Sequence, residues 1–174
     1  EAVLEDYLVA GKGRPADLNF NTAYYGIKGG ACQFTGTGDD AARKAFDGDG
    51  KTAWLHRAES TWLQCHFGEG KRHLATSYAV TANDAGRLPS ALALSGSNDG
   101  GATWTVLDEQ GDAGFTAGVD RREFPISEPG KWNLFRLQLT SADPGEGVQI
   151  AGVELLEHIR CRPGSGVRSV ALDH

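Results

Sequence analysis

The sequence predicts an all-β fold, a single β-sandwich domain with short extensions at both ends. The chain has 174 residues, 24 of them glycine, and turn pairs such as Asp47-Gly48, Asp99-Gly100 and Pro129-Gly130 interrupt it at short intervals. Stretches with the 3.6-residue period of a helix are scarce. Domains usually have about 100–150 residues, so this length suits one core. We expect a sandwich over 29–161, a lead-in or linker over 1–28 and a tail over 162–174.

The expected elements begin with a strand at 31–34, ACQF, and a helical turn at 39–44 capped by its acidic residues. The segment 45–54, AFDGDGKTAW, is too rich in Gly and Asp for a strand and is expected to be a structured loop. Seven further strands are predicted over 61–67, 73–82, 91–97, 103–108, 120–126, 131–140 and 148–158. Eight short strands with turn residues between them are typical of a sandwich or barrel.

The charge balance argues against two classes of partner. The formal net charge is −6, and no run of Lys or Arg stands out. The electrostatic attraction that dominates non-specific nucleic-acid binding is therefore missing, and anionic membranes are disfavoured for the same reason. No stretch approaches the ~18–20 apolar residues that span a bilayer. The N-terminus lacks the pattern of a signal peptide, so a secreted chain would already have lost its leader.

The three cysteines, Cys32, Cys65 and Cys161, are too few for a disulfide scaffold, and their spacing matches no zinc motif. Cys32 lies just before the first confident core strand signals and Cys161 just after the last, where the first and last strands of a sandwich often meet. Either they form a disulfide, worth about 4–5 kcal/mol for so long a loop, or they are two unpaired thiols. Cys65 alternates with Leu63 and Phe67, so it is predicted to be a small core residue.

Five segments, taken in order, resemble the factor V/VIII type C (discoidin-like) family. They are AFDGDGKTAW (45–54), WLQCHFG (62–68), the long stretch 77–108, FRLQLTSA (135–142) and VQIAGVELL (148–156). The similarity is strongest to the carbohydrate-binding module family 32-like branch, whose members are often appended to bacterial glycoside hydrolases. It covers about 45–156 and implies an eight-stranded jelly-roll sandwich related to the galactose-binding domain fold.

The segment SNDGGATW (97–104) predicts a hairpin turn, since Asn98 to Gly101 supply the positive-φ positions that a tight turn needs. The same letters match the Asp-box of sialidase propellers. In those proteins the box recurs from blade to blade, whereas this sequence holds it once. We therefore interpret it as a turn.

The resemblance also implies a structural calcium site in the AFDGD loop. The matching positions are the Lys44 carbonyl, Asp47, Asp49 and Thr52, and a loop dense in Asp, Gly and Thr can direct several oxygens inward. The family usually adds a Glu from the last core strand, where this chain has Gly152. Glu154 lies two residues on, a shift of about 6–7 Å that makes it a poor replacement. The alternative is a rigid loop without an ion, closed by Asp side chains on backbone N–H groups.

Family members bind sugars on loops at one end of the sandwich, and two loops qualify here. The strongest candidates are His56 and Arg87. The supporting candidates are Trp54, Arg57, Glu59, Asn83 and Asp84. Each has a simpler interpretation: Trp54 as a core residue, the arginines as solvated charges, and Asn83-Asp84 as the closure of its own loop. Trp62, Trp104 and Trp132 lie within strand patterns and are predicted to pack, which leaves no spare aromatic platform for a sugar.

The leading hypothesis is a non-catalytic carbohydrate-binding module of a larger secreted or periplasmic bacterial protein, with neighbouring domains and a galactose- or N-acetyl-hexosamine-type glycan as partners. No nucleophile elbow, carboxylate pair or phosphate-binding Gly loop is recognisable, which argues against an enzyme. The alternative is a structural or protein-interaction module that mediates adhesion without sugar. A phospholipid-binding role ranks below both, because the exposed apolar spikes and basic ring that it needs are missing.

Overall fold

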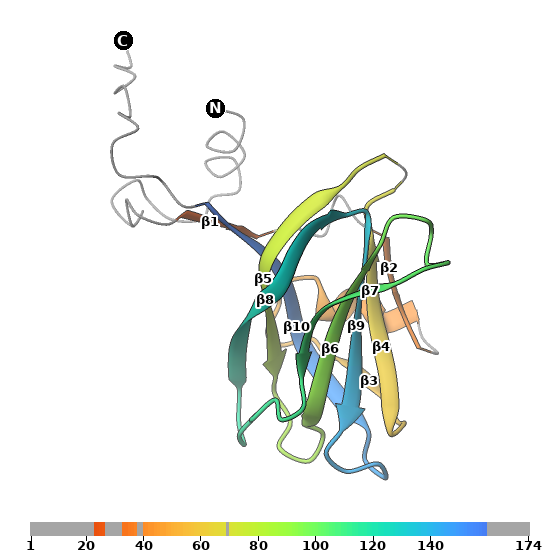
Figure 1. Cartoon of the computed structure of the whole chain (residues 1–174). Helices are drawn as coiled ribbons and strands as arrows, with labels where there is room; N and C mark the ends of the chain where they lie inside the picture. Colours follow the sequence, from red (N-terminus) through yellow and green to blue (C-terminus); the bar gives the residue numbers. More distant parts are fainter. Residues whose placement is uncertain (1–22, 27–32, 38–39, 69, 160–174) are drawn as a thin grey trace, which may run out of the picture. The chain divides into compact units, whose positions relative to one another are not determined.

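The computed structural model describes residues 23–26, 33–37, 40–68 and 70–159 (Figure 1). The chain divides into two compact units, Gly26–Glu157 and a second unit made of Glu1–Tyr25 with His158–His174. The predicted tail over 162–174 and nearly all of the lead-in lie outside the described residues. Within the part of the chain that the structure describes, no helix has the length and apolar character needed to cross a bilayer.

Ten strands and one short 3-10 helix make up the described chain. In order they are β1 (Ala23–Gly26), β2 (Gln33–Gly36), η3 (Asp40–Ala45), β3 (Trp54–His56), β4 (Ser60–His66), β5 (His73–Ala82), β6 (Pro89–Ser97), β7 (Thr105–Gln110), β8 (Asp120–Trp132), β9 (Leu134–Ser141) and β10 (Val148–Ile159). The prediction of an all-β fold is confirmed.

The strands form two sheets. One has the order β1-β10-β5-β8, with β3 also paired to β10, and the other has the order β2-β4-β9-β6-β7. The pairings whose register is resolved are all antiparallel. From β2 to β10 the chain crosses to the other sheet at each connection except β6–β7, whose two strands are neighbours in one sheet. Such crossings make a galactose-binding-like β-sandwich, as predicted.

Alternating side chains decide which face of each strand is buried. In β4, Leu63 and Cys65 are buried while Trp62 and Gln64 are only partly covered, which is the period of two expected for a half-buried strand. Leu63 lies opposite Leu137 of β9, so both point into the same layer.

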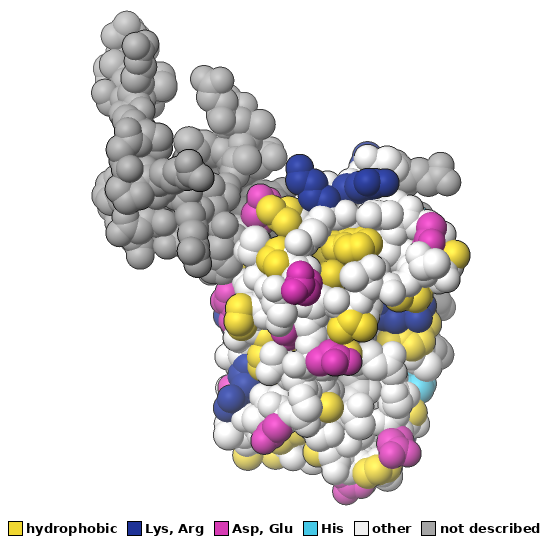
Figure 2. Space-filling view, viewed as in Figure 1, with side chains coloured by type: hydrophobic (Ala, Val, Ile, Leu, Met, Phe, Trp, Pro, Cys, Tyr) yellow, Lys and Arg dark blue, Asp and Glu magenta, His cyan; other side chains and the backbone are white. Residues whose placement is uncertain are grey.

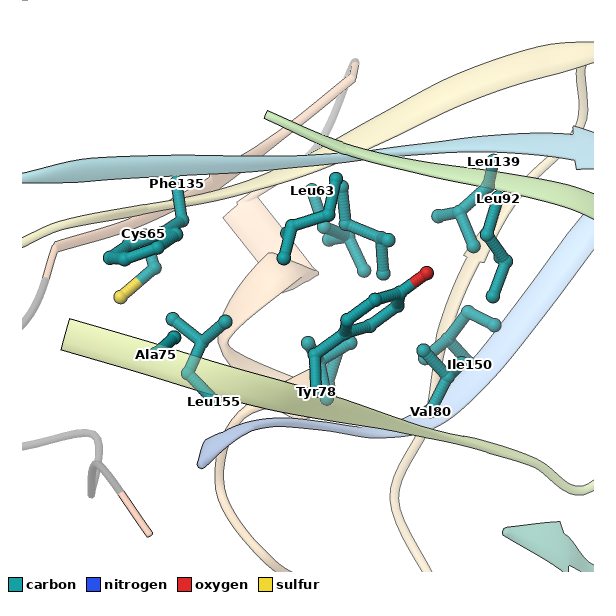
Figure 3. Close-up of a cluster of buried hydrophobic side chains, with 14 of the residues drawn as sticks. Leu63, Cys65, Ala75, Tyr78, Val80, Leu92, Phe135, Leu139, Ile150 and Leu155 are labelled. Atoms are coloured by element: carbon teal, nitrogen blue, oxygen red, sulfur yellow. The ribbon is translucent and has the colours of Figure 1, made fainter. Parts of the chain in front are cut away.

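The core lies between the two sheets (Figure 3). Leu63, Leu92 and Phe135 extend from one sheet toward Tyr78 and Ile150 of the other, and each of the five is at most 3% exposed. Burying a large apolar side chain stabilises the fold by about 1.5–3 kcal/mol. This layer therefore fixes the positions of the connecting loops.

One carboxylate, that of Asp108 on β7, is buried beside this core layer. Asp108, 5% exposed, accepts hydrogen bonds from the Tyr78 hydroxyl (2.9 Å), Gln110 Nε2 (2.9 Å) and Ser127 Oγ (2.8 Å). Burial, together with the bond to Asp108, raises the pKa of Tyr78 well above its usual range. The network ties β5 of one sheet to β7 of the other, so the polar atoms cost little to bury.

Several predicted boundaries were wrong. Trp54–His56 forms the strand β3, and Ala23–Gly26 forms β1 inside the predicted lead-in. The strand predicted at 131–140 divides, because 131–132 end β8 and β9 begins at Leu134. Pro129-Gly130 is accordingly no turn and lies within β8, where the pairing with β5 is irregular between Ala75 and Ser77.

The cysteine prediction was also wrong. Cys65 is buried in the core as expected, but it is disulfide-bonded. Its partner lies outside the described residues, and in a chain with three cysteines it is Cys32 or Cys161. Either pairing excludes the predicted bridge between Cys32 and Cys161.

Candidate functional site

The candidate site lies at one end of the sandwich, where the β5–β6 and β9–β10 connections come together (lower end of Figure 1). Backbone hydrogen bonds fix these connections to one another. Ala142 N donates to Leu88 O (2.9 Å), and Gln149 N donates to Arg87 O (3.0 Å). A third bond, from Ser141 N to Glu59 O (2.8 Å), joins the β3–β4 connection to the same end. We call this set of loops the rim; it comprises residues 56–59, 83–88 and 142–149.

Arg87 is held between two carboxylates. Its Nη1 lies 2.6 Å from Asp84 Oδ2, and its Nη2 lies 3.2 Å from Glu146 Oε2. Asp84 Oδ1 also accepts the Gly86 N–H at 2.9 Å. That backbone bond and the Arg87 contact lower the pKa of Asp84, so the carboxylate stays charged and keeps the guanidinium oriented.

His56 ends β3 and lies beside the same loops. Val148 of β10 pairs with it, and a Cβ at Gly147 would lie 2.3 Å from the His56 carbonyl oxygen. Gly147, at φ +83°, is therefore the residue that lets the β9–β10 loop approach β3 so closely. Its neighbour Glu146 contacts Arg87, so Glu146 and Gly147 link the two strongest candidates.

The amide side chains complete the rim. Gln149 Nε2 donates to Asn83 Oδ1 at 2.9 Å, which leaves Asn83 Nδ2 without an acceptor among the described residues. The atoms His56 Nδ1 and Arg87 Nε are buried and have no hydrogen-bond partner within that part of the chain. Donors and acceptors lie next to one another here, as the recognition of sugar hydroxyl groups requires.

The predicted ligand residues differ in the contacts that the structure gives them. Asp84 is paired with Arg87, Asn83 with Gln149, and the His56 backbone lies against Gly147; that these residues bind a ligand stays a prediction. Arg57 and Glu59 are exposed on the β3–β4 connection, and the structure gives their side chains no partner among the described residues.

Trp54 is a correction to the predicted ligand set. It is 0% exposed, so it cannot serve as a platform for a sugar. Its ring instead lies parallel to that of His56, with centroids 6.0 Å apart and 7° between the planes. Trp54 is therefore a core residue whose ring lies next to that of His56.

Glu146 and Gln149 were missed by sequence reasoning. The signal that could have found them is the Pro144-Gly145 turn between the last two strands. In an antiparallel sandwich, connections that follow strands running in the same direction lie at the same end, so this turn lies beside the β5–β6 connection. These two residues can be identified only from their place at the ends of the strands, because no local sequence motif marks them.

The loop predicted to bind calcium brings its four oxygen donors together. Thr52 Oγ1 lies 2.6 Å from Asp47 Oδ2, 3.0 Å from Asp49 O and 3.4 Å from Lys44 O. Asp47 Oδ1 accepts the Asp49 N–H (2.8 Å), and Asp49 Oδ1 accepts the Lys51 N–H (2.9 Å). An all-oxygen set with one inward carboxylate fits calcium, although Ca²⁺ takes six to eight ligands.

The rest of the expected calcium set differs. Gly152 lies two residues after Ile150, the partner of Trp54, so it lies toward the Thr52 end of the β3–β10 pair. Glu154 is engaged elsewhere, with Arg121 Nε at 2.6 Å. Among the described residues no cluster of three or more His, Cys, Asp or Glu is placed to hold a metal ion. A calcium here would therefore depend on carbonyl, hydroxyl and water oxygens beside Asp47.

Comparisons with known proteins agree with this architecture. The Arabidopsis thaliana peptide-N(4)-(N-acetyl-beta-glucosaminyl)asparagine amidase is 37% identical over 105 residues, which cover 58% of this chain and 15% of the amidase. This chain therefore corresponds to a small part of that relative's length.

Two solved structures show the same fold. One is the family 32 carbohydrate-binding module of Clostridium perfringens NanJ in complex with galactose, with a TM-score of 0.64, 18% identity and coverage of 78% of this chain and 100% of that one. The other is CpGH89CBM32-5 from Clostridium perfringens in complex with GalNAc-beta-1,3-galactose, with a TM-score of 0.61, 14% identity and coverage of 75% and 99%. The sequence itself matches the F5/8 type C domain family over residues 29–153, and the chain belongs to that family.

Proposed function

We propose that this chain is a non-catalytic carbohydrate-binding module that holds a neutral hexose or N-acetyl-hexosamine at the rim. The observation that carries the proposal is the fixed Arg87 guanidinium between Asp84 and Glu146, next to the Gly147 approach to the His56 backbone. Carboxylate-oriented guanidinium groups and amides give directional bonds to hydroxyl groups. The sugars bound by the two bacterial modules of the same fold support this ligand class.

The affinity expected at a single rim is low. Within the described part of the rim no aromatic side chain is exposed, so a pyranose has no flat apolar surface on which to lie. Weak modules are useful when tethered, since a linked domain makes the second contact intramolecular. We therefore infer that the chain belongs to a longer carbohydrate-active protein, in line with the name of its Arabidopsis relative.

The proposed location is outside the cytosol. A disulfide at Cys65 supports this, because stable disulfides are typical of secreted and periplasmic proteins and rare in reducing compartments. We also propose that the Lys44–Thr52 loop holds a structural calcium. Its carbonyl and carboxylate oxygens would bind the ion, and bound calcium would hold the loop that precedes β3.

Calorimetry tests the sugar site. Galactose, N-acetylgalactosamine and N-acetylglucosamine titrated into the chain should give a dissociation constant of about 1 mM for at least one sugar, or roughly −4 kcal/mol. His56→Ala and Arg87→Ala should each weaken that binding at least about tenfold, since each removes a hydrogen-bonding group worth ~1.4 kcal/mol or more. Arg121→Ala, on a sheet strand and paired with Glu154, is the matched control and should bind as the wild type.

Two results would contradict the proposal. One is the absence of heat with a folded wild-type chain at millimolar sugar. The other is unchanged binding by both rim variants. Either result would favour the alternative module, which contacts a neighbouring protein domain without sugar.

A further inference from the structure

A second polar and aromatic cluster lies on the outer face of the β2-β4-β9-β6-β7 sheet. The guanidinium of Arg136 on β9 is stacked between two indoles, with its Cζ 4.8 Å from the Trp62 ring centre and 4.2 Å from that of Trp104. Its Nε donates to Gln64 Oε1 at 2.9 Å. In Figure 2 a basic side chain lies between hydrophobic ones toward the right of the view, the side on which β4 lies in Figure 1.

Leu134 and Gly101 lie next to this stack. Leu134 lies opposite Ser97 of β6 and is only 3% exposed, although it faces the same side of β9 as Arg136. A Cβ at Gly101 would lie 3.1 Å from the Trp104 ring and 3.6 Å from Leu134, so the hairpin seats this indole over the sheet. The two cation–π contacts orient the guanidinium, whose N–H donors lie along the edge of its plane.

That edge presents hydrogen-bond donors without acceptors. The two Nη groups of Arg136 and the Nε1 atoms of Trp62 and Trp104 have no acceptor among the described residues, and none of these atoms is buried. Arg121 and Arg122, the other arginines on described strands, each pair with a carboxylate. Arg136 instead has a neutral amide as its partner, in a chain that is acidic overall.

The neighbouring side chains on this face are short or polar. Ser95 of β6 lies opposite Arg136, and Val106 of β7, 51% exposed, lies opposite Ser95. A ligand lying across β9, β6 and β7 would thus meet an apolar methyl surface next to the donor edge. Bidentate pairing of the guanidinium with a carboxylate matches the donor geometry, and each indole adds apolar area and an N–H donor.

We propose that the Trp62–Arg136–Trp104 face binds a glycan that carries a carboxylate on its pyranose ring, a hexuronate chain, independently of the rim. The carboxylate accepts hydrogen bonds from the two Nη groups, and the ring lies against the partly exposed indoles and the exposed Val106. The rim differs in chemistry, because its arginine is already neutralised by two carboxylates. One module would then carry two surfaces, one for neutral sugars and one for acidic sugars.

Trigalacturonate and its methyl ester test the proposal, since the ester keeps the ring and removes the charge. The full chain should bind the free acid at least tenfold more tightly than the ester. In a nitrogen–proton spectrum the acid should shift the indole N–H signals of Trp62 and Trp104 and leave those of Trp54 and Trp132 unchanged, because both of the latter Nε1 atoms are buried. Trp62→Phe and Trp104→Phe assign the signals.

Arg136→Lys keeps the charge but loses the planar fork, so it should weaken binding of the acid at least tenfold. Arg121→Lys and Arg87→Lys are the matched controls and should bind the acid as the wild type. If Arg136→Lys fails to fold, the acid and ester comparison on the wild type still decides.

Three outcomes overturn the proposal: equal binding of acid and ester, unchanged binding by a folded Arg136→Lys variant, or loss of binding by Arg87→Lys alone. Indole shifts produced only by a peptide with a free C-terminal carboxylate would also overturn it, in favour of a protein partner. Loss of neutral-sugar binding in the rim variants leaves this proposal untouched, so the two proposals fail separately.

Discussion

The Asp99 side chain makes several of the hydrogen bonds that hold the β6–β7 hairpin. Its carboxylate accepts the Thr103 hydroxyl, the Thr103 N–H at 2.9 Å and the Ser97 hydroxyl at 2.7 Å. Gly100 and Gly101 follow at φ +72° and +90°, so the turn predicted from the sequence is confirmed. The two bonds from Thr103, followed by that from Ser97, lower the pKa of Asp99 to about 2.

The hairpin should consequently be sensitive to acid. A carboxylate with a lowered folded pKa contributes stability above its ordinary pKa of about 3.9, and the contribution disappears as the pH falls toward 2. Unfolding midpoints of the wild type should fall over this range, and Asp99→Asn should flatten that part of the profile. Asp112→Asn, an exposed carboxylate in another loop, is the control. Identical acid profiles for the wild type and Asp99→Asn would contradict the assignment.

At single residues, sequence reasoning succeeded where chemistry is local. The turn at Asn98–Gly101 depends on neighbours within a few residues, and so does the grouping of the loop oxygens around Thr52. Both were predicted. Trp54 and Glu146 depend on distant strands. Trp54 is covered because β3 packs over the core, and Glu146 meets Arg87 across two loops 59 residues apart. No local pattern encodes either fact.

Among the elements, β5 was predicted with its observed bounds, because ten residues of consistent strand propensity leave one interpretation. The strand β3 was missed because it has three residues and follows a loop of Asp and Gly. Its existence depends on pairing with β10, which a short segment cannot show alone. The break between β8 and β9 was misplaced for a related reason: Gly130 pairs with Ala75, so this Pro-Gly pair continues the strand.

The calcium loop yields a prediction at this scale. Calcium should raise the melting temperature of the wild type by roughly 2–4 °C at a free concentration several times the dissociation constant, since binding to the native state alone adds about 1 kcal/mol. Asp47→Asn removes the inward carboxylate and should abolish the shift. Differential scanning calorimetry with calcium and with a chelator measures it. A shift retained in Asp47→Asn would place the ion elsewhere.

Gly152→Glu should strengthen the same site. A Cβ at this position would lie 3.2 Å from Thr81 Oγ1 and 3.3 Å from Thr81 Cβ, so a small movement of that side chain accommodates it. The added carboxylate should increase the calcium-dependent shift beyond that of the wild type. Gly152→Gln has the same shape without the charge, and it serves as the matched control. Equal responses from the two variants would show that position 152 does not reach the ion.

For the whole molecule, the two-sheet arrangement was predictable because inward residues alternate along β4, β6 and β9. The pairing of the cysteines was not, since a buried Cys65 in a strand has the same pattern whether it is free or bonded. Alternation determines only the face on which a side chain lies. A disulfide needs two specific Cβ atoms at bonding distance, which depends on how the strands are placed in three dimensions.

The disulfide at Cys65 should dominate the stability of the whole chain. It closes a loop of roughly 30 to 100 residues, and the loss of loop entropy in the unfolded state then amounts to about 4–5 kcal/mol. Reduction should lower the melting temperature by roughly 10 °C or more, and thiol titration of the denatured, unreduced chain should find a single free thiol. Cys32→Ala and Cys161→Ala distinguish the two partners, because only one of them should match the reduced protein in stability. Recovery of a peptide that links Cys32 to Cys161 would contradict this pairing, and Cys65 would then contribute only its packing in the core.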